Sequence, residues 1–186
     1  MKQRLKQLLS QRQKKHIRDE SRVPAAVLLP IYFKQGQYYI LFTKRTLTVR
    51  DHKGQISFPG GSYQDEDGIL LETALRESTE EIGLRAEDVE ILGELDDELS
   101  LTSNYTISPF VGLIPWPYQF QANEEETEEI IKVPIPALMD KNCQYPEIQN
   151  GEVANSYHYQ EKVIWGATAR ILGQFLDIFT QATQGK

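Results

Sequence analysis

Three glutamates, Glu77, Glu80 and Glu81, lie close together in the stretch RESTEEIGL. The surrounding pattern predicts a helix from about Ile69 to Ile82, on which Glu77 and Glu81 are one turn apart and Glu80 lies beside them. Carboxylates this close repel one another. A hard divalent cation such as Mg²⁺ or Mn²⁺ would offset the repulsion and would also bind the phosphate oxygens of a substrate. We therefore expect these three side chains to be metal ligands.

The rest of this helix fits the same interpretation. Leu71, Leu75, Ser78 and Ile82 share a narrow sector that should face the core, so the glutamates are expected on roughly the opposite side. Upstream, Gly60 and Gly61 follow Phe58-Pro59, and such a glycine loop lets backbone approach a ligand closely. A solvated acidic face is the alternative for the glutamates, but the combination with this loop and with Arg76 favours a site.

The elements that must position this helix are mostly short strands. Apolar and β-branched runs predict strands at 23–33, 38–45, 55–58, 89–95, 107–114, 145–148 and 156–164. A final amphipathic helix is predicted at 167–180, and residues 123–129, NEEETEE, are expected to form an acidic loop. This mixture favours an α+β fold, layered as an αβα sandwich.

Charge is spread unevenly over the 186 residues, which have a formal net charge of −7. Residues 1–22 hold eight of the 20 Lys and Arg residues, whereas the remainder, with 12 basic and 25 acidic residues, carries −13. Such a body should repel nucleic acid, so no nucleic-acid partner is expected. We predict a basic helical extension at 1–22 and one domain at 23–186.

The extension is predicted to be helical over residues 3–17, with leucines on one side and bases on the other. A docking or dimerising helix is the favoured interpretation, which makes a homodimer a further expectation. A phosphate-contacting or membrane-surface role is the alternative. No apolar run is long enough for a membrane span and no secretion signal is evident. With Cys143 as the only cysteine, these features predict a cytoplasmic protein without a membrane partner.

The stretch from Gly61 to Leu84 resembles the Nudix box, G-x5-E-x7-R-E-U-x-E-E-x-G-U, where U is aliphatic. Arg76, Glu77, Glu80, Glu81, Gly83 and Leu84 match its second half. Ser78 replaces an aliphatic residue. The interval from Gly61 to Arg76 is one residue longer than in the pattern, so Gly68 stands at the first acidic position and Asp67 is the nearest acid. Asp67 is expected either to serve the metal site or to cap the helix.

A second motif resembles the one that marks coenzyme A pyrophosphatases within this superfamily, L-L-T-x-R-[SA]-x3-R-x3-G-x3-F-P-G-G. It begins at Leu41, continues through Lys44, Arg45, Arg50 and Gly54, and ends at Gly61, with Phe42 and Thr46 as departures. The cationic side chains Lys44, Arg45 and Arg50 and the backbone of Gly60 and Gly61 are therefore the expected substrate-binding groups. Arginine can fork onto a phosphate, and lysine acts as a point charge.

The resemblance implies a Nudix fold, an αβα sandwich with a mixed sheet and a catalytic loop-helix-loop. It also implies metal-dependent hydrolysis of coenzyme A or acyl-coenzyme A to 3′,5′-ADP and 4′-phosphopantetheine. Glu77, Glu80, Glu81 and the Gly60 carbonyl would hold Mg²⁺ or Mn²⁺, and Arg76 would orient the carboxylates. Glu77 or Glu80 could act as the general base. Glu126 is the loop candidate for that role, because Asn123 and Glu126 match an N-x-x-E pattern of the subfamily.

Two rival functions follow from the same residues. One is a Nudix enzyme for another nucleoside diphosphate derivative, such as ADP-ribose, NADH or a dinucleoside polyphosphate. The other is a non-catalytic Nudix module that senses a nucleotide. The complete glutamate set argues against the second, because a module that only binds need not keep all three carboxylates.

Overall fold

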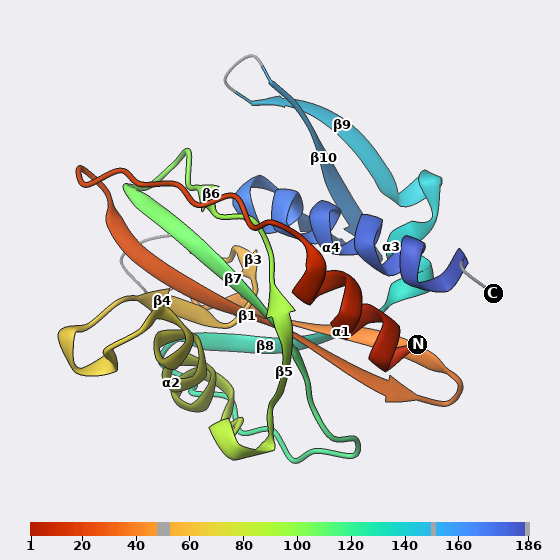
Figure 1. Ribbon diagram of the computed structural model, residues 1–186, viewed down its shortest axis with the longest axis horizontal. Helices are drawn as coiled ribbons and strands as arrows, with labels where there is room; N and C mark the ends of the chain where they lie inside the picture. Colours follow the sequence, from red (N-terminus) through yellow and green to blue (C-terminus); the bar gives the residue numbers. More distant parts are fainter. Residues whose placement is uncertain (48–52, 150–151, 185–186) are drawn as a thin grey trace.

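The computed structural model describes residues 1–47, 53–149 and 152–184, and most of its strands form one mixed sheet (Figure 1). The strand order is β3-β2-β1-β7-β5, while β4 pairs with β1, β6 with β7 and β8 with β2. Strands β1 and β7 are parallel, and the other pairs of this sheet are antiparallel. The strands are β1 (Val23–Lys34), β2 (Gln37–Arg45), β3 (Ile56–Ser57), β4 (Gly60–Ser62), β5 (Glu90–Glu94), β6 (Glu98–Leu99), β7 (Tyr105–Leu113) and β8 (Thr127–Pro134).

Helices cover both faces of this sheet. Helix α2 (Leu70–Ile82) packs on one face, and α1 (Lys2–Gln11), α3 (Ile135–Met139) and α4 (Gly166–Gln184) lie on the other. Because side chains alternate along a strand, β1 supplies both cores. Its Leu28 belongs to the cluster beneath α2, and its Leu29 to the cluster beneath α4. The predicted αβα sandwich is confirmed, with α2 and α4 separated by the sheet (Figure 1).

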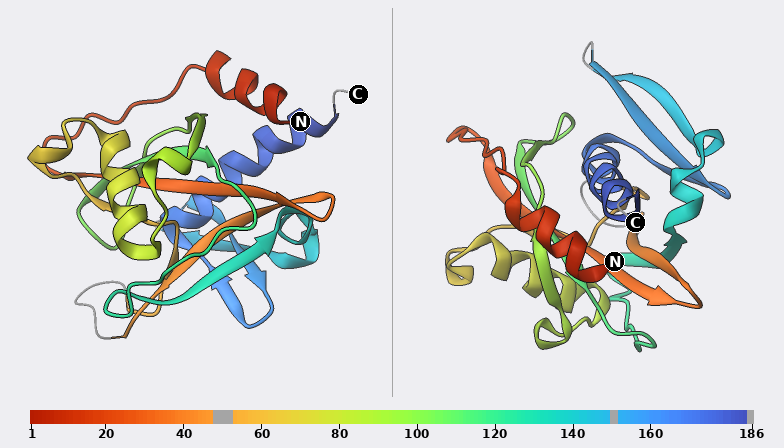
Figure 2. Two further views of the ribbon diagram at one scale, coloured as in Figure 1. Left: turned by 90° about the horizontal axis from the view of Figure 1, so that it is seen from below. Right: turned by 45° about the vertical axis from the view of Figure 1, so that its right-hand side comes forward.

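A smaller antiparallel sheet has the order β11-β10-β9 and leads into α4. Its strands are β9 (Gln144–Gln149), β10 (Glu152–Tyr159) and β11 (Lys162–Ile164). The β9–β10 hairpin projects from the body of the molecule (Figures 1 and 2). The single strand predicted over 156–164 is two strands, because the chain turns at Gln160, which has a positive φ of 56°. Short 3₁₀ turns lie at Asp65–Asp67, Ala86–Asp88 and Lys141–Cys143.

The basic N-terminal segment folds against the rest of the chain. Helix α1 ends at Gln11, earlier than predicted, and its Leu5 and Leu9 are buried in the same core as α4. Beyond the helix, Lys14 forms ion pairs with Glu94 and Asp97 at 2.7 and 3.0 Å. The bases are thus partly neutralised within the chain. The predicted division into an extension at 1–22 and a domain at 23–186 stays a prediction.

The acidic loop predicted at 123–129 is wrong in its second half. Strand β8 begins at Thr127, so Glu128 and Glu129 belong to the sheet, where β8 pairs with β2. Their side chains bind Lys44 and Lys162 at 2.8 and 2.7 Å. An acidic composition favoured a loop, but pairing with β2 and these ion pairs hold the segment as strand.

Within the described residues, no helix combines the length and the apolarity needed to cross a membrane.

Candidate active site

The three glutamates of α2 differ greatly in exposure. Glu80 is exposed, with 57% of its side chain accessible, whereas the Glu77 side chain is only 14% accessible. Glu81 is buried at 3%. The expectation that all three lie away from the core is therefore wrong for Glu81, because the strand and loop next to α2 cover that side of the helix. One helix thus presents carboxylates at three depths.

Strand β4 brings backbone against these carboxylates. It pairs with β1, with Gly60 opposite Val27 and Gly61 opposite Ala26. A β-carbon on Gly60 would lie 2.3 Å from the carbonyl oxygen of Ala26, so only glycine fits this strand pairing. A β-carbon on Gly61 would lie 2.5 Å from Cδ of Glu77. The two glycines therefore allow close contact with the sheet on one side and with a site carboxylate on the other.

Arg76 is held in place by four oxygen-bearing partners. Its Nε donates to Asp67 Oδ1 at 2.7 Å, and its Nη1 donates to Glu77 at 2.8 Å and to Glu80 at 3.1 Å. Its Nη2 donates to Asp67 Oδ2 and to the carbonyl of Ser62. The carboxylates raise the pKa of Arg76 above its usual value, chiefly through the hydrogen bond with Asp67. Arg76 therefore links β4 to two of the three glutamates and lies in contact with their carboxylates.

Asp67 anchors this arrangement. Besides Arg76, it accepts hydrogen bonds from the backbone N–H of Gln64 at 3.0 Å and the hydroxyl of Thr73 at 2.8 Å. The Arg76 hydrogen bond, above all, holds the pKa of Asp67 well below its usual range. The cap of α2 is Ile69, without a side-chain hydrogen bond. Asp67 thus closes its own 3₁₀ turn and fixes Arg76 and Thr73.

Glu81 has an incompletely satisfied carboxylate. Arg45 Nη1 is 3.6 Å from its Oε1, while its buried Oε2 has no hydrogen-bond partner among the described residues. Burial raises the pKa of Glu81 to about 8, and Arg45 opposes that shift. Burial also raises the pKa of Glu77, again against the effect of its neighbouring arginine. A buried carboxylate oxygen without a donor suits a cation better than a solvated surface.

Glu126 reaches this region from a distant segment. The backbone N–H of Asn123 donates to the Glu81 carbonyl at 2.9 Å, and Thr46 N–H donates to the Glu126 carbonyl at 2.9 Å. The loop is thus tied to both α2 and the end of β2. Glu126 lines the same cavity as Arg45, Gly60 and Gly61, and its negative charge contributes to the raised pKa of Glu77 and of Glu81.

The cationic residues of the upstream motif separate in space. Arg45 lies between the glutamates and an adjoining cavity, and its buried Nε has no hydrogen-bond partner among the described residues. Lys44, on the opposite side of the strand, is paired with Glu128 and is not among the residues that line the cavity. Arg50 lies outside the described residues. Of these three expected substrate-binding cations, the structure therefore brings Arg45 to the glutamates.

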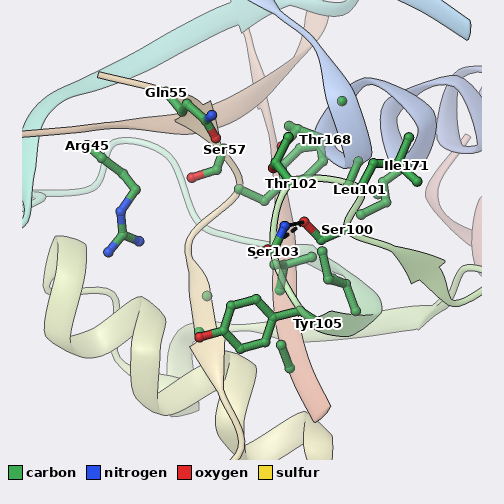
Figure 3. Close-up of a pocket in the computed structure, with 18 of the residues that line it drawn as sticks. Arg45, Gln55, Ser57, Ser100, Leu101, Thr102, Ser103, Tyr105, Thr168 and Ile171 are labelled. Carbon is green, nitrogen blue, oxygen red and sulfur yellow. Dashed lines mark hydrogen bonds between the residues drawn. The ribbon is translucent and has the colours of Figure 1, made fainter. Parts of the chain in front are cut away.

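The cavity has a volume of about 450 Å³ and is lined by strands and loops far apart in the sequence (Figure 3). Its wall includes Arg45, Gly60, Gly61 and Glu126, all expected from the sequence. The segment Ser100–Ser103, Tyr105 and the segment Trp165–Thr168 were not predicted as site residues. Hydroxyl-bearing and small residues in short loops gave no periodic pattern.

The oxygen-rich donor set fits Mg²⁺ or Mn²⁺. The unpartnered Oε2 of Glu81 and the contact between Gly61 and the Glu77 carboxylate agree with a site for a small hard cation. Within residues 1–47, 53–149 and 152–184, no three carboxylate, histidine or cysteine side chains form a preformed metal cluster. The reason is visible in the hydrogen bonds, since Arg76 holds Glu77 and Glu80. Arg76 binds one oxygen of each carboxylate, Oε1 of Glu77 and Oε2 of Glu80, so the second oxygen of each could still face an ion.

Comparisons with known proteins identify the family of this chain. Residues 21–149 match the model of the NUDIX domain. The chain is 38% identical over 152 residues to a protein of Yersinia enterocolitica named uncharacterized Nudix hydrolase NudL, which covers 80% of this chain and 77% of that protein. A protein of the same name from Photorhabdus laumondii is 37% identical over 164 residues, covering 86% of each.

Solved structures show the same fold at lower identity. A binary complex of the C. elegans Ap4A hydrolase superposes with a TM-score of 0.57 at 15% identity, over 88% of this chain and 99% of that one. The NUDIX domain of Shewanella oneidensis NrtR, in a cocrystal structure with ADP ribose, superposes with a TM-score of 0.51 at 16% identity. The match covers 63% of this chain and 76% of that one. The predicted Nudix fold is thereby confirmed, and the chain belongs to the Nudix family of pyrophosphohydrolases.

Proposed function

We propose that this chain hydrolyses the pyrophosphate bond of coenzyme A or acyl-coenzyme A, giving 3′,5′-ADP and 4′-phosphopantetheine or its acyl form. The observation that carries the proposal is the position of Arg45. The motif from Leu41 to Gly61 resembles that of coenzyme A pyrophosphatases. Arg45 of this motif lies at the boundary between the glutamate cluster and the cavity. A guanidinium there can bind a phosphate oxygen of a substrate that extends into the cavity.

The chain's own groups have distinct roles in this proposal. Glu77, Glu80 and Glu81, with the carbonyl of Gly60, would hold Mg²⁺ or Mn²⁺. When bound, the ion supplies charge neutralisation of the phosphates and a lowered pKa for a coordinated water. Arg45 binds a phosphate oxygen, and Arg76 orients the carboxylates of Glu77 and Glu80 through its hydrogen bonds to them.

Glu126 is the proposed general base. It lines the cavity and lies beside Glu77 and Glu81 without being part of the helix that would hold the ion. A carboxylate not engaged by the metal is free to accept the proton of the attacking water. The loop contacts at Asn123 and Thr46 fix its backbone relative to α2 and β2.

The proposal is tested by turnover of a substrate panel with Mg²⁺ and Mn²⁺. The panel compares coenzyme A and an acyl-coenzyme A with dephospho-coenzyme A, ADP-ribose, NADH and a dinucleoside polyphosphate. The expected result is the highest kcat/KM for coenzyme A or its thioester. If dephospho-coenzyme A were cleaved equally well, Lys44, Arg45 and Arg50 would have no role in recognising the 3′-phosphate. A higher kcat/KM for ADP-ribose would overturn the substrate assignment.

A further inference from the structure

The cavity beside the glutamates is charged at one end and neutral over the rest of its wall. Among the described residues that line it, the charged side chains are Arg45 and Glu126, both next to the carboxylate cluster. Figure 3 shows Arg45 on one side of the cavity and Leu101, Thr102 and Thr168 on the other. The distant wall therefore offers no charged partner to an anion in the part of the chain that the structure describes.

That distant wall combines hydroxyls with apolar surface. The hydroxyls of Thr102, Thr168 and, nearer the middle, Ser57 line the cavity and make no hydrogen bond to another described residue. Beside Thr102 and Thr168, the apolar side chains of Leu101 and Ile171 line the same side of the cavity (Figure 3). A ligand there can gain from apolar burial and can use free hydroxyls for its own polar atoms.

Hydrogen bonds from two arginines hold the backbone that leads into the loop with Thr102. Arg22 Nη1 donates to the carbonyl of Ser100 at 3.0 Å, and Arg170 Nη2 donates to the carbonyl of Leu99 at 2.6 Å. The hydroxyls of Ser100 and Ser103 bond each other across the turn. The wall is therefore shaped before a ligand binds, which lowers the entropy lost on binding.

We infer that this neutral part of the cavity binds the pantetheine half of the substrate and that the 3′-phosphoadenosine half lies outside it. The inference rests on the proposed function. The pantetheine arm carries no charge and alternates amides with methylene and methyl groups, so it matches both the free hydroxyls and the apolar side chains beside them. The leaving 4′-phosphate would then lie at the charged end, next to Arg45.

The nucleotide half has the opposite requirement. Its 3′-phosphate carries roughly −1.5 to −2 charges near neutral pH, by analogy with other phosphate monoesters. Enclosing that group against a wall without a cation would cost solvation free energy that no partner offsets. Its place is therefore on the Arg45 side of the cavity, towards β2.

Calorimetric binding of the two product halves, each with Mg²⁺, tests the inference directly. The variant Ala167→Leu narrows the cavity, and Thr168→Val removes one hydroxyl with little change of shape. We expect Ala167→Leu to weaken 4′-phosphopantetheine binding by about tenfold through overpacking, and Thr168→Val to weaken it by about threefold to tenfold through loss of a hydrogen bond. The Kd of 3′,5′-ADP should stay within about twofold of wild type, since its contacts lie elsewhere.

Thr183→Val is the matched control, because Thr183 lies on the same helix about 22 Å from Thr168. It should change neither Kd. Weaker binding of 3′,5′-ADP with unchanged 4′-phosphopantetheine binding would overturn the inference by placing the nucleotide in the cavity. Unchanged binding of both halves by both cavity variants would also overturn it.

The proposed function can fail independently of the cavity assignment, namely if the wild-type protein does not cleave coenzyme A. In that case, selective loss of 4′-phosphopantetheine binding would still support the cavity assignment. Failure of wild type to bind either half would overturn it.

Discussion

Gly61 packs directly against the carboxylate of Glu77, so a side chain at position 61 would collide with that carboxylate. A β-carbon at position 61 would lie 2.5 Å from Cδ and 2.6 Å from Oε1 of Glu77. The strand β4 and the helix α2 thus fix each other's position at the site. A side chain at position 61 would therefore have to displace the Glu77 carboxylate.

Replacing Gly61 by alanine should displace the Glu77 carboxylate. We expect activity to fall by about 10- to 100-fold, as for other changes next to metal ligands, with weaker Mn²⁺ binding in calorimetry. Gly36→Ala is the control. It imposes a left-handed φ of 84° on alanine in a hairpin with open space, so it should cost stability without lowering kcat. Native activity and metal affinity in Gly61→Ala would show that Glu77 is not a ligand.

Asp67→Asn should disturb Arg76 without touching the glutamates. We expect an activity loss of about 10- to 100-fold, because the arginine that orients two carboxylates loses its anchor. Asp65→Asn, an exposed neighbour in the same turn, should behave as wild type. Equal activity of the two variants would remove Asp67 and Arg76 from the positioning of the site.

The difference in free energy of unfolding between wild type and Asp67→Asn should depend on pH in a defined direction. The pKa of Asp67 lies below its ordinary value of 3.8, so the unfolded chain binds this proton at a higher pH than the native one. The stability that ionised Asp67 contributes is present above about pH 4 and is lost as pH falls through the native pKa. Urea unfolding should show this difference in free energy narrowing as pH falls below about 4. A difference that stays constant with pH would contradict the stabilising role of ionised Asp67.

Metal binding should be linked to the titration of Glu81. Its pKa of about 8 means that the metal-free protein carries a proton there at neutral pH, which the ion must displace. Affinity for Mg²⁺ or Mn²⁺ should therefore rise with pH up to about 8, with proton release seen by calorimetry in buffers of different ionisation enthalpy. Without metal, the free energy of unfolding should fall as pH rises from 4.5 to about 8, because the native state holds the extra proton there.

The variant Glu81→Gln tests whether Glu81 is both a metal ligand and the group that releases the proton. It should abolish turnover and proton release while leaving the fold intact, and Glu72→Gln on the exposed side of the same helix should change neither. Near-native turnover in Glu81→Gln would contradict its role as a ligand. The same proton release in Glu81→Gln as in wild type would assign the titration to another group.

Glu126→Gln should lower kcat by about 10²- to 10⁴-fold if it removes the general base, with a smaller change in KM. The limb of the pH–rate profile that reports the base should also disappear. Glu124→Gln, an exposed neighbour in the same loop, is the control and should retain both rate and profile. A rate and profile unchanged in Glu126→Gln would leave Glu77 or Glu80 as the base.

The sequence predicted the layers and the helix that holds the glutamates, because period-2 and period-3.6 patterns report which faces are buried. It failed for β8, whose acidic start at Thr127–Glu129 is held as strand by pairing with β2. Helix periodicity also placed Glu81 away from the core. It is buried there because Arg45 and the β4 loop cover it, and contacts between distant segments leave no local signal.

The site was predictable as far as its residues lie in contiguous motifs. Gly61, Arg76 and Glu77 were found together, and the structure brings them into contact. The loop of Ser100–Ser103 was not found, since its place in the cavity depends on tertiary bonds from Arg22 and Arg170. Alternation along a strand is enough to separate Lys44 from Arg45, but it could not show that their partners are Glu128 and Glu81, which come from distant segments.

The most direct test of the central claim is identification of the products formed from coenzyme A by the purified protein with Mg²⁺ or Mn²⁺. Mass spectrometry should find 3′,5′-ADP and 4′-phosphopantetheine in equal amounts, formed only with added metal and absent with Glu81→Gln. Intact coenzyme A after prolonged incubation, together with cleavage of ADP-ribose or a dinucleoside polyphosphate under the same conditions, would contradict the assignment.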